Sequence, residues 1–174
     1  MRRLTLLRHA KSSWRDTSLP DRERPLSSRG ERDAPMMGLR MKAHRARPSL
    51  ILTSHAVRAT ATARIVARAL GFPEEFLQTE RALYLAAPDA ILTVVAAQDD
   101  RFEDILVVGH NPGMTDLANR LLPDLALDNL PTGGVVAIDS DAAAWRDVAS
   151  ASCRLAFYDY PKNPQPVFIE RPVR

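Results

Sequence analysis

The sequence predicts a three-layer α/β domain, with a mostly parallel central sheet and helices on both faces of that sheet. Short apolar runs rich in Val, Ile and Leu alternate with longer stretches of helical periodicity along the 174 residues. This alternation is typical of a sheet that helices cover on both sides. The length suits one domain with a full hydrophobic core, so we expect a single domain over residues 1–174.

Six apolar runs are the candidate strands of this sheet. The first opens the chain, and the third is the shortest and least apolar. In chain order they are Arg3–Leu7, Leu50–Leu52, Phe76–Gln78, Ile105–Val108, Val135–Ile138 and Arg154–Tyr158.

Four stretches between these runs are predicted as helices. The clearest is Val57–Leu70, which has apolar residues near one face and Gly71 as its stop. The other three cover 28–45, Asp89–Ala97 and Pro112–Leu122.

The first helix has a recognisable start. Ser28 and Glu31 could form a capping box there. Pro35 lies inside the helical pattern and should kink the helix or delay its start. The polar residues 16–27 before it are expected to form a loop, and the proline-rich tail from Pro161 is expected to be extended.

Cysteine content and hydropathy limit the class of protein. Cys153 is the only cysteine, so no intrachain disulfide and no cysteine metal cluster can form. No apolar run approaches the length that crosses a bilayer. Residues 1–8 are basic and then apolar, but the apolar part is too short for a signal peptide. We therefore expect a cytoplasmic protein without a membrane partner.

Positive charge is concentrated near the N-terminus. Residues 1–47 hold 13 Lys and Arg against 5 Asp and Glu, whereas the rest of the chain holds 11 against 16. This basic part could attract an anionic ligand, or it could be a set of solvated arginines on loops and one helix face. Nucleic acid is not expected as a partner, because no aromatic interleaving or recognition motif accompanies the charge.

Charged side chains follow three of the predicted strands where each strand ends. Arg8 and His9 follow the first strand, Arg58 lies just beyond the second, and His110 follows the strand that ends at Val108. Ligands of parallel α/β sheets bind at the carboxyl ends of the strands. Since three of the four histidines lie at such junctions, we expect one shared site at this edge.

The residue types at this edge suit a phosphate group. Arg58 falls at the start of a helix, where free backbone N–H groups and the helix dipole favour an anion. Arginine also pairs with phosphate oxygens in a bidentate way. The sequence has no Walker-type glycine loop, no carboxylate cluster for Mg²⁺ and no tight metal spacing of histidines. Phosphoryl transfer without a metal or cofactor needs a protein nucleophile, and neutral histidine can serve.

Three motifs in this order resemble the histidine phosphatase superfamily, which includes the cofactor-dependent phosphoglycerate mutases and acid phosphatases. Residues 7–12 (Leu-Arg-His-Ala-Lys-Ser) resemble its Arg-His-Gly signature. Residues 54–63 resemble its motif Ser-Pro-x-x-Arg-Ala-x-Gln-Thr-Ala, and residues 108–111 resemble its second-histidine motif. The short length, the stretch at 24–30 and the His-Asn-Pro step at 110–112 look like the small bacterial SixA-type branch. That branch is associated with phosphohistidine phosphatase activity.

The resemblance implies a phosphoglycerate mutase-like fold and a role for each matched residue. His9 would attack phosphorus and carry the phosphoryl group, and a water would then hydrolyse phospho-His9. Arg8, Arg58 and His110 would bind the phosphoryl oxygens and stabilise their charge, and Asn111 is a further candidate for phosphate binding. The resemblance implies no metal and no cofactor.

A carboxylic acid often protonates the leaving group in this superfamily. Glu80 is the candidate here, because it follows the third predicted strand. Asp16 and Asp89 are the alternatives.

Three positions depart from the superfamily pattern. Ala10 replaces a glycine, His55 replaces a proline and Ala61 replaces a glutamine, and none of these changes removes a charged group. His55 could contact the ligand or face solvent. Lys11 and Ser12 could touch the substrate or serve only in a turn.

We therefore expect a metal-independent phosphatase that acts on phosphohistidine in a signalling or phosphotransfer protein. A small phosphate ester is the alternative substrate. A mutase is disfavoured, since only 51 residues separate Arg58 from His110 and leave little room for a substrate cap. The alternative from another class is a phosphate-recognition module without turnover.

Overall fold

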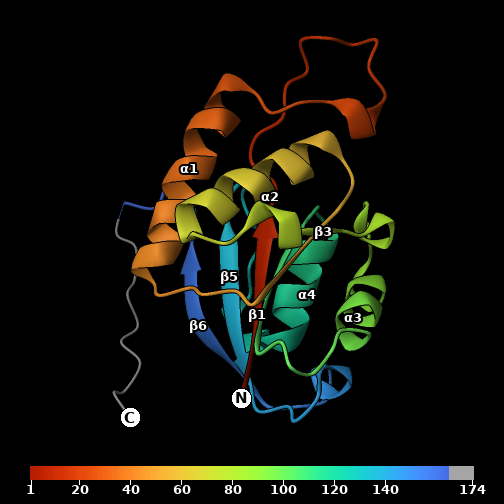
Figure 1. Cartoon of the computed structure of the whole chain (residues 1–174), viewed down its shortest axis with the longest axis vertical. Helices are drawn as coiled ribbons and strands as arrows, with labels where there is room; N and C mark the ends of the chain where they lie inside the picture. The colour runs from red at the N-terminus through yellow and green to blue at the C-terminus, as the bar shows by residue number, and fades with distance from the viewer. Residues whose placement is uncertain (165–174) are drawn as a thin grey trace.

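A six-stranded sheet runs through the computed structural model, which describes residues 1–164 (Figure 1). The strand order is β3-β2-β4-β1-β5-β6. Of these six strands, β5 alone runs opposite to the other five, so the prediction of a mostly parallel sheet is confirmed. The strands are β1 (Arg2–Arg8), β2 (Leu50–Thr53), β3 (Gln78–Thr79), β4 (Asp104–Gly109), β5 (Val135–Ser140) and β6 (Cys153–Asp159).

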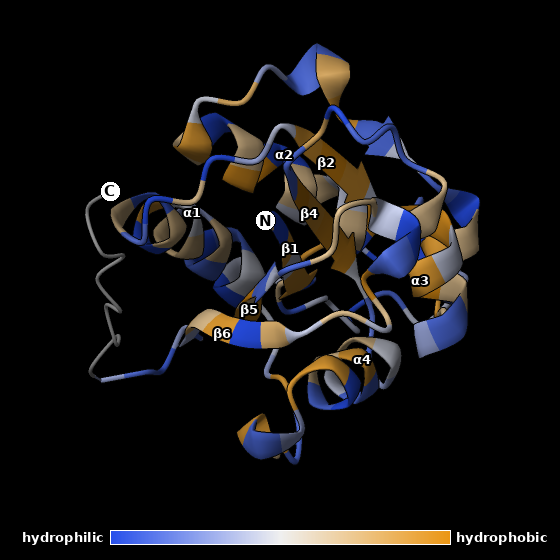
Figure 2. Ribbon diagram, turned by 90° about the horizontal axis from the view of Figure 1, so that it is seen from below, coloured by the Kyte–Doolittle hydropathy of each residue, from blue (hydrophilic) through white to orange (hydrophobic). Residues whose placement is uncertain are grey.

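Helices cover both faces of the sheet, as predicted, and Figure 2 shows the apolar strands between them. One pair packs with β1, β4 and β5 in one apolar cluster, and the other pair packs on the opposite face. None of the helices within residues 1–164 combines the length and the hydrophobicity needed to span a bilayer. The first pair is α3 (Pro88–Ala96) and α4 (Gly113–Leu121), and the second is α1 (Ser28–Ala43) and α2 (Val57–Leu70).

The strands are apolar on both faces because two separate cores cover them. In β1, Leu4 and Leu6 pack toward α3 and α4, whereas Leu7 packs toward α1 and α2. In β4, Ile105 and Leu106 divide between the two cores in the same way. Side chains alternate along a strand, so burial on both faces requires a nearly continuous apolar run. A polar side chain therefore costs the least free energy of burial at the strand ends.

Local structure differs from the sequence predictions in three places. Ser27, rather than Ser28, caps α1, because its hydroxyl accepts from the Gly30 N–H at 3.2 Å. Pro35 does not delay the start, since α1 runs unbroken from Ser28 to Ala43. The third strand begins two residues later than predicted, because 74–76 form a short 3₁₀ turn.

The start of the tail also differs from its prediction, whereas the end of α2 does not. Gly71 ends α2 with a φ of 73°, as predicted. Residues 161–162 form a turn rather than an extended segment. The rest of the predicted tail, from 165 on, lies outside the described residues.

Backbone hydrogen bonds bring the three strand ends together. The N–H of His9 donates to the Gly109 carbonyl at 3.0 Å, which extends the parallel pairing of β1 and β4 by one residue. The N–H of Ser54 donates to the Val108 carbonyl at 3.0 Å, which does the same for β2 and β4. The carboxyl ends of β1, β2 and β4 are therefore adjacent.

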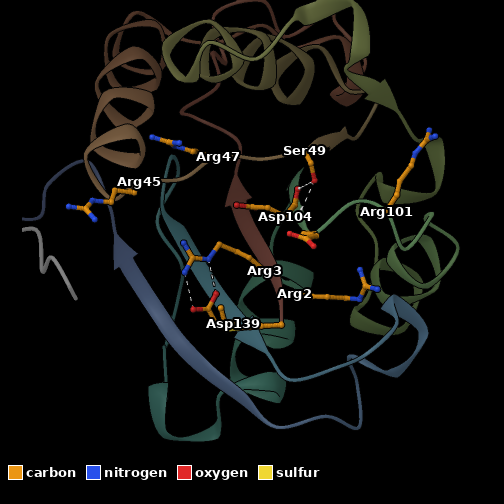
Figure 3. Close-up of a pocket in the computed structure, with 10 residues that line it drawn as sticks. Arg2, Arg3, Arg45, Arg47, Ser49, Arg101, Asp104 and Asp139 are labelled. Carbon is orange, nitrogen blue, oxygen red and sulfur yellow. Dashed lines mark hydrogen bonds and ion pairs between the residues drawn. The ribbon is translucent and has the colours of Figure 1, made fainter. Parts of the chain in front are cut away.

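A basic pocket of about 370 Å³ lies at the opposite edge, where the parallel strands begin (Figure 3). One of its two buried arginines, Arg3, donates to both carboxylate oxygens of Asp139 at 2.8 and 2.9 Å. Glu103 and Asp104 also line the pocket and reduce its positive charge. Its walls include no histidine, so the chemistry expected from the sequence belongs to the carboxyl edge.

Candidate active site

His9 is held with one ring nitrogen tied to the backbone and the other directed at an arginine. Its side chain is buried, and Nδ1 lies 2.8 Å from the carbonyl oxygen of Ala10. A carbonyl can only accept, so Nδ1 carries the proton. Nε2 then carries an unprotonated lone pair, which accepts a hydrogen bond from Arg58 Nε at 3.3 Å.

The environment keeps this imidazole neutral. Burial is the main cause that lowers the pKa of His9, to about 4. The hydrogen bond to Ala10 opposes this shift, whereas nearby positive charges add to it. Those charges belong to Arg58, Arg8 and Arg24. Near pH 7, His9 is therefore an uncharged base beside three cations, which is the form that can attack an electrophile.

Arg58 lies in the first turn of α2 and joins the two histidines. Its side chain is buried, and Nη2 lies 3.4 Å from Nδ1 of His110. The rings of His9 and His110 are 5.1 Å apart between centroids. The Nε and Nη2 edge of the guanidinium therefore faces both imidazoles.

The end of the Arg58 guanidinium, formed by Nη1 and Nη2, is bound by Asp21 from the 3₁₀ turn Asp21–Glu23. Nη1 donates to the Asp21 carbonyl at 2.6 Å, and Nη2 donates to its carboxylate at 2.9 Å. The Tyr84 hydroxyl donates to the same carboxylate oxygen. Sequence analysis assigned no role to Asp21 or Tyr84.

His110 is fixed by a hydroxyl at the end of β2. Its Nε2 lies 2.7 Å from Ser54 Oγ, and that oxygen accepts from the Ala56 N–H at 3.2 Å. The Ser54 hydroxyl can donate its proton to Nε2 or accept from an Nε2–H, because Oγ keeps a second lone pair. Arg58 has only N–H donors, so its contact with Nδ1 is a hydrogen bond when the ring proton is on Nε2. With the proton on Nδ1 instead, His110 and Arg58 could both donate to one anion.

Burial and neighbouring cations also keep His110 uncharged. Burial lowers its pKa to about 3, and the charges of a protonated His9 and of Arg58 act in the same direction. A neutral His110 with its proton on Nδ1 is a hydrogen-bond donor that adds no charge to the site.

Arg8 is the last residue of β1 and is half-buried. Its Nη1 donates to the Leu130 carbonyl at 2.8 Å. Its buried Nε has no hydrogen-bond partner among residues 1–164. Burial lowers its pKa, yet the ordinary value of arginine is so high that the side chain stays cationic.

The backbone after His9 is tied to two helices. The Ala10 N–H donates to Thr62 Oγ1 at 3.0 Å, and the same hydroxyl donates to the Arg58 carbonyl at 2.7 Å. On the other side, the Lys11 carbonyl touches α1 so closely that a Cβ on Gly30 would lie 2.1 Å from it. These contacts explain why small residues surround the nucleophile loop.

The candidate acids from the sequence lie outside this cluster. Glu80 follows β3 at the correct edge, where its N–H donates to the Thr53 carbonyl. Within residues 1–164, no hydrogen bond or ion pair joins its carboxylate to His9, Arg58 or His110. The exposed Asp16 bonds to Ser18 in its own loop, and Asp89 pairs with Arg120.

The side-chain amide of Asn111 forms hydrogen bonds with other residues of the protein. Its amide nitrogen donates to Asn129 Oδ1 at 2.9 Å and to the Leu130 carbonyl at 3.0 Å. Its amide oxygen accepts from the N–H and the hydroxyl of Thr115. Both amide protons are thus used, and none remains for a phosphate oxygen.

Three further candidates surround the cluster. His55 packs edge-on against Tyr84, with ring centroids 5.3 Å apart. The hydroxyl of Ser12 accepts from Arg24 at 2.9 Å. The backbone carbonyl of Lys11 contacts the start of α1. Within residues 1–164, no group of three His, Cys, Asp or Glu side chains is arranged to bind a metal ion.

Comparison with known proteins identifies the family. The profile of the Histidine phosphatase superfamily (branch 1) matches residues 4–83. A solved structure from Agrobacterium tumefaciens, named as a candidate phosphohistidine phosphatase SixA, is 30% identical. The alignment covers 92% of this chain and 98% of that one, with a TM-score of 0.78. The chain belongs to the histidine phosphatase superfamily. Within that superfamily it falls in the SixA-type branch, as the sequence predicted, and this places it among phosphatases.

Two other histidine phosphatases share the fold at lower identity. A protein histidine phosphatase SixA solved with tungstate is 20% identical, with a TM-score of 0.74 over 94% of this chain and 99% of that one. A mycobacterial glucosyl-3-phosphoglycerate phosphatase is 16% identical, with a TM-score of 0.65 over 89% and 97%. The same phosphoglycerate mutase-like fold is thus found in proteins named for a protein substrate and for a small phosphate ester.

A relative is also known in plants. An uncharacterized chloroplastic protein of Arabidopsis thaliana is 37% identical over 130 residues. These residues are 69% of this chain but only 59% of the plant protein.

Proposed function

We propose that this histidine phosphatase hydrolyses phosphohistidine in a protein, through a phosphorylated His9 and without a metal ion. The observation that carries the proposal is the state of His9. Its Nδ1 proton is held by the Ala10 carbonyl, and its Nε2 lone pair faces Arg58. A neutral, oriented imidazole beside a guanidinium is what a phosphoryl-accepting nucleophile requires.

The first chemical step transfers the phosphoryl group to the ring. The Nε2 lone pair forms a bond to phosphorus while the bond from phosphorus to the leaving nitrogen breaks, and that nitrogen takes up a proton. The ring gains positive charge as the bond forms. The Ala10 carbonyl, bound to Nδ1–H, stabilises this charge in the same way that a carboxylate does in a hydrolase triad.

Fixed donors stabilise the charge on the phosphoryl oxygens. Arg58 and His110 direct N–H groups into the same space beside His9, and Arg8 adds a second guanidinium. Preorganised donors of this kind contribute most when negative charge is spread over the transferring group. In the second step a water attacks phosphorus, the bond to Nε2 breaks and inorganic phosphate leaves.

Phosphohistidine suits this site better as a substrate than an alkyl phosphate ester does, because its leaving group depends less on protonation by an acid. Glu80 is still our candidate for the proton donor, although no hydrogen bond or ion pair among the described residues joins its carboxylate to the cluster. A phosphoramidate such as phosphohistidine is reactive, and the departure of its nitrogen needs less help from an acid than the departure of an alkoxide does. The 30% identity to a candidate phosphohistidine phosphatase supports the same substrate class, and a cytoplasmic role in signalling is part of this proposal.

A small phosphate ester is the second candidate substrate. The fold-level match to a glucosyl-3-phosphoglycerate phosphatase favours it. The ratio of kcat/KM for a phosphohistidine protein to kcat/KM for glycerol phosphate would decide between the two.

A trapping experiment tests the mechanism. The protein is mixed with a protein carrying labelled phosphohistidine and quenched in alkali, and the label is mapped along the chain. We expect label on His9, none in His9→Ala, and retained label in His55→Ala, which keeps the nucleophile and removes a neighbouring histidine.

Two outcomes would contradict the proposal. Steady turnover by His9→Ala would mean that another group is the nucleophile. Tight, saturable phosphate binding without any label or released phosphate would mean that the site is a recognition module.

A further inference from the structure

Asp21 fixes which edge of Arg58 faces the two histidines. Its backbone oxygen and its carboxylate accept from Nη1 and Nη2, at 2.6 and 2.9 Å. The Nε side of the guanidinium is turned the other way, with Nε 3.3 Å from His9 and Nη2 3.4 Å from His110. When a carboxylate binds the Nη1 and Nη2 end of an arginine, the N–H groups along the Nε and Nη2 side can still donate to a second anion.

Asp21 is itself held from several directions. Tyr84 donates to Oδ2, and Arg24 donates to Oδ1 from Nε at 3.2 Å and from Nη2 at 3.1 Å. Arg24 is in turn bound to Ser12 Oγ and lies 3.5 Å from the Trp14 ring centroid. The carboxylate therefore has a fixed position, although it belongs to an exposed loop.

The charges of the cluster are consistent with a phosphoryl dianion. Partial burial alone would raise the pKa of Asp21, but hydrogen bonds from Tyr84 and Arg58 outweigh it and hold the pKa well below its usual range. Asp21 is therefore a carboxylate near neutral pH. Together with Arg8, Arg24 and Arg58 it leaves a formal charge of +2, which matches a dianion.

We propose that Asp21 is a positioning residue for phosphoryl transfer, which orients Arg58 without touching the phosphoryl group. The inference rests on the proposed role of Arg58. A guanidinium without this anchor would have to be immobilised at each turnover, and misplacement of a catalytic group by about 1 Å costs on the order of 10²-fold in rate. The exposed loop 13–23 is thereby coupled to the active site.

Kinetics of Asp21 variants test this role. Asp21→Ala should lower kcat by about 10²-fold and change KM less, because the arginine contact strengthens in the transition state. Asp21→Asn keeps an oxygen that can accept from Arg58 and should restore part of the loss. Asp16→Asn, in the same loop, is the matched control, because within residues 1–164 that carboxylate forms hydrogen bonds with Ser18 alone.

A double-mutant cycle separates positioning from a general effect on folding. In an Arg58→Ala background, Asp21→Ala should cost almost nothing further, because no guanidinium remains to be oriented. An equal loss in both backgrounds would overturn the inference. If Arg58→Ala itself left turnover unchanged, the proposed function would be wrong instead.

Binding of tungstate, measured by calorimetry, gives a readout that needs no turnover. Asp21→Ala should bind tungstate more weakly, and Tyr84→Phe should change the affinity in the same direction by a smaller factor. Tighter binding by Asp21→Ala would mean that the carboxylate competes with the oxyanion for Arg58, and it would refute the positioning role.

Discussion

The Ser54 hydroxyl lies 2.7 Å from Nε2 of His110 and holds that imidazole with Nδ1 toward Arg58. The same oxygen accepts from the Ala56 N–H, and its own proton can be donated to Nε2. The hydroxyl can therefore support the tautomer with Nδ1–H, which donates to an anion beside Arg58.

Ser54→Ala should therefore impair the site without changing its charge. Without the hydroxyl donor, the Nδ1–H tautomer of His110 is no longer supported at Nε2, and the donor beside Arg58 is lost for part of the time. Loss of one such donor lowers kcat by about 10²-fold. The ¹⁵N shifts of His110 should show a change of tautomer, whereas Thr60→Ala, one turn into α2, should leave those shifts unchanged.

The pH dependence of stability should report the buried neutral histidines. The pKa values of His9 and His110 are lowered to about 4 and about 3, while an unfolded histidine has an ordinary value near 6.5. Between these values the unfolded chain binds more protons than the folded one. Stability is therefore complete above about pH 6.5 and is lost as the pH falls toward 4.

His9→Ala isolates one contribution to this loss. A shift to about 4 corresponds to about 3 kcal/mol, which wild type should lose on acidification and the variant should not. The measurement is the free energy of unfolding from denaturant titrations between pH 7 and pH 4. A pH slope that is the same in both proteins, or an NMR titration of His9 near pH 6.5, would contradict the assignment.

Thr62→Val should loosen the nucleophile loop. The hydroxyl of Thr62 accepts from the buried Ala10 N–H, and valine would leave that donor without a partner. An unpaired buried N–H costs about 1–3 kcal/mol of stability, and the rate of His9 phosphorylation should fall as well. Thr60→Val is the control, because its hydroxyl donates to carbonyls of Ser54 and Ala56 and satisfies no buried N–H. Equal effects of the two variants would count against this account.

Gly30→Ala should separate α1 from the nucleophile loop. Its Cβ would lie 2.1 Å from the Lys11 carbonyl oxygen, so one backbone segment must move. We expect a loss of about 1–3 kcal/mol in stability together with lower activity. Gly71→Ala is the comparison: its φ of 73° is strained for alanine, but among the described residues no atom outside the adjoining chain lies within 4 Å of the new Cβ. It should lose stability and keep its activity, as judged by thermal melts and initial rates.

The strand ends could be found from the sequence because their signals are local. Apolar runs such as 105–108 mark buried strands, and parallel strands present their carboxyl ends at one edge. His9, Arg58 and His110 each lie within six residues of such an end, so their proximity followed from the pattern. Glu80 and Asn111 also lie at this edge, but within residues 1–164 no hydrogen bond or ion pair joins their side chains to His9, Arg58 or His110.

The sequence by itself determined the fold class, the order of most elements and the residues that meet at the carboxyl edge. Tertiary structure alone decided the surroundings of Arg58. Asp21 lies in a polar loop without periodicity, 37 residues from Arg58 and 63 from Tyr84 along the chain. Contacts between such distant segments depend on how loops pack over the finished sheet, and no local pattern encodes them. The tautomer of His9 was likewise decided by its hydrogen-bond partner, the Ala10 carbonyl, which lies beside the ring only after folding.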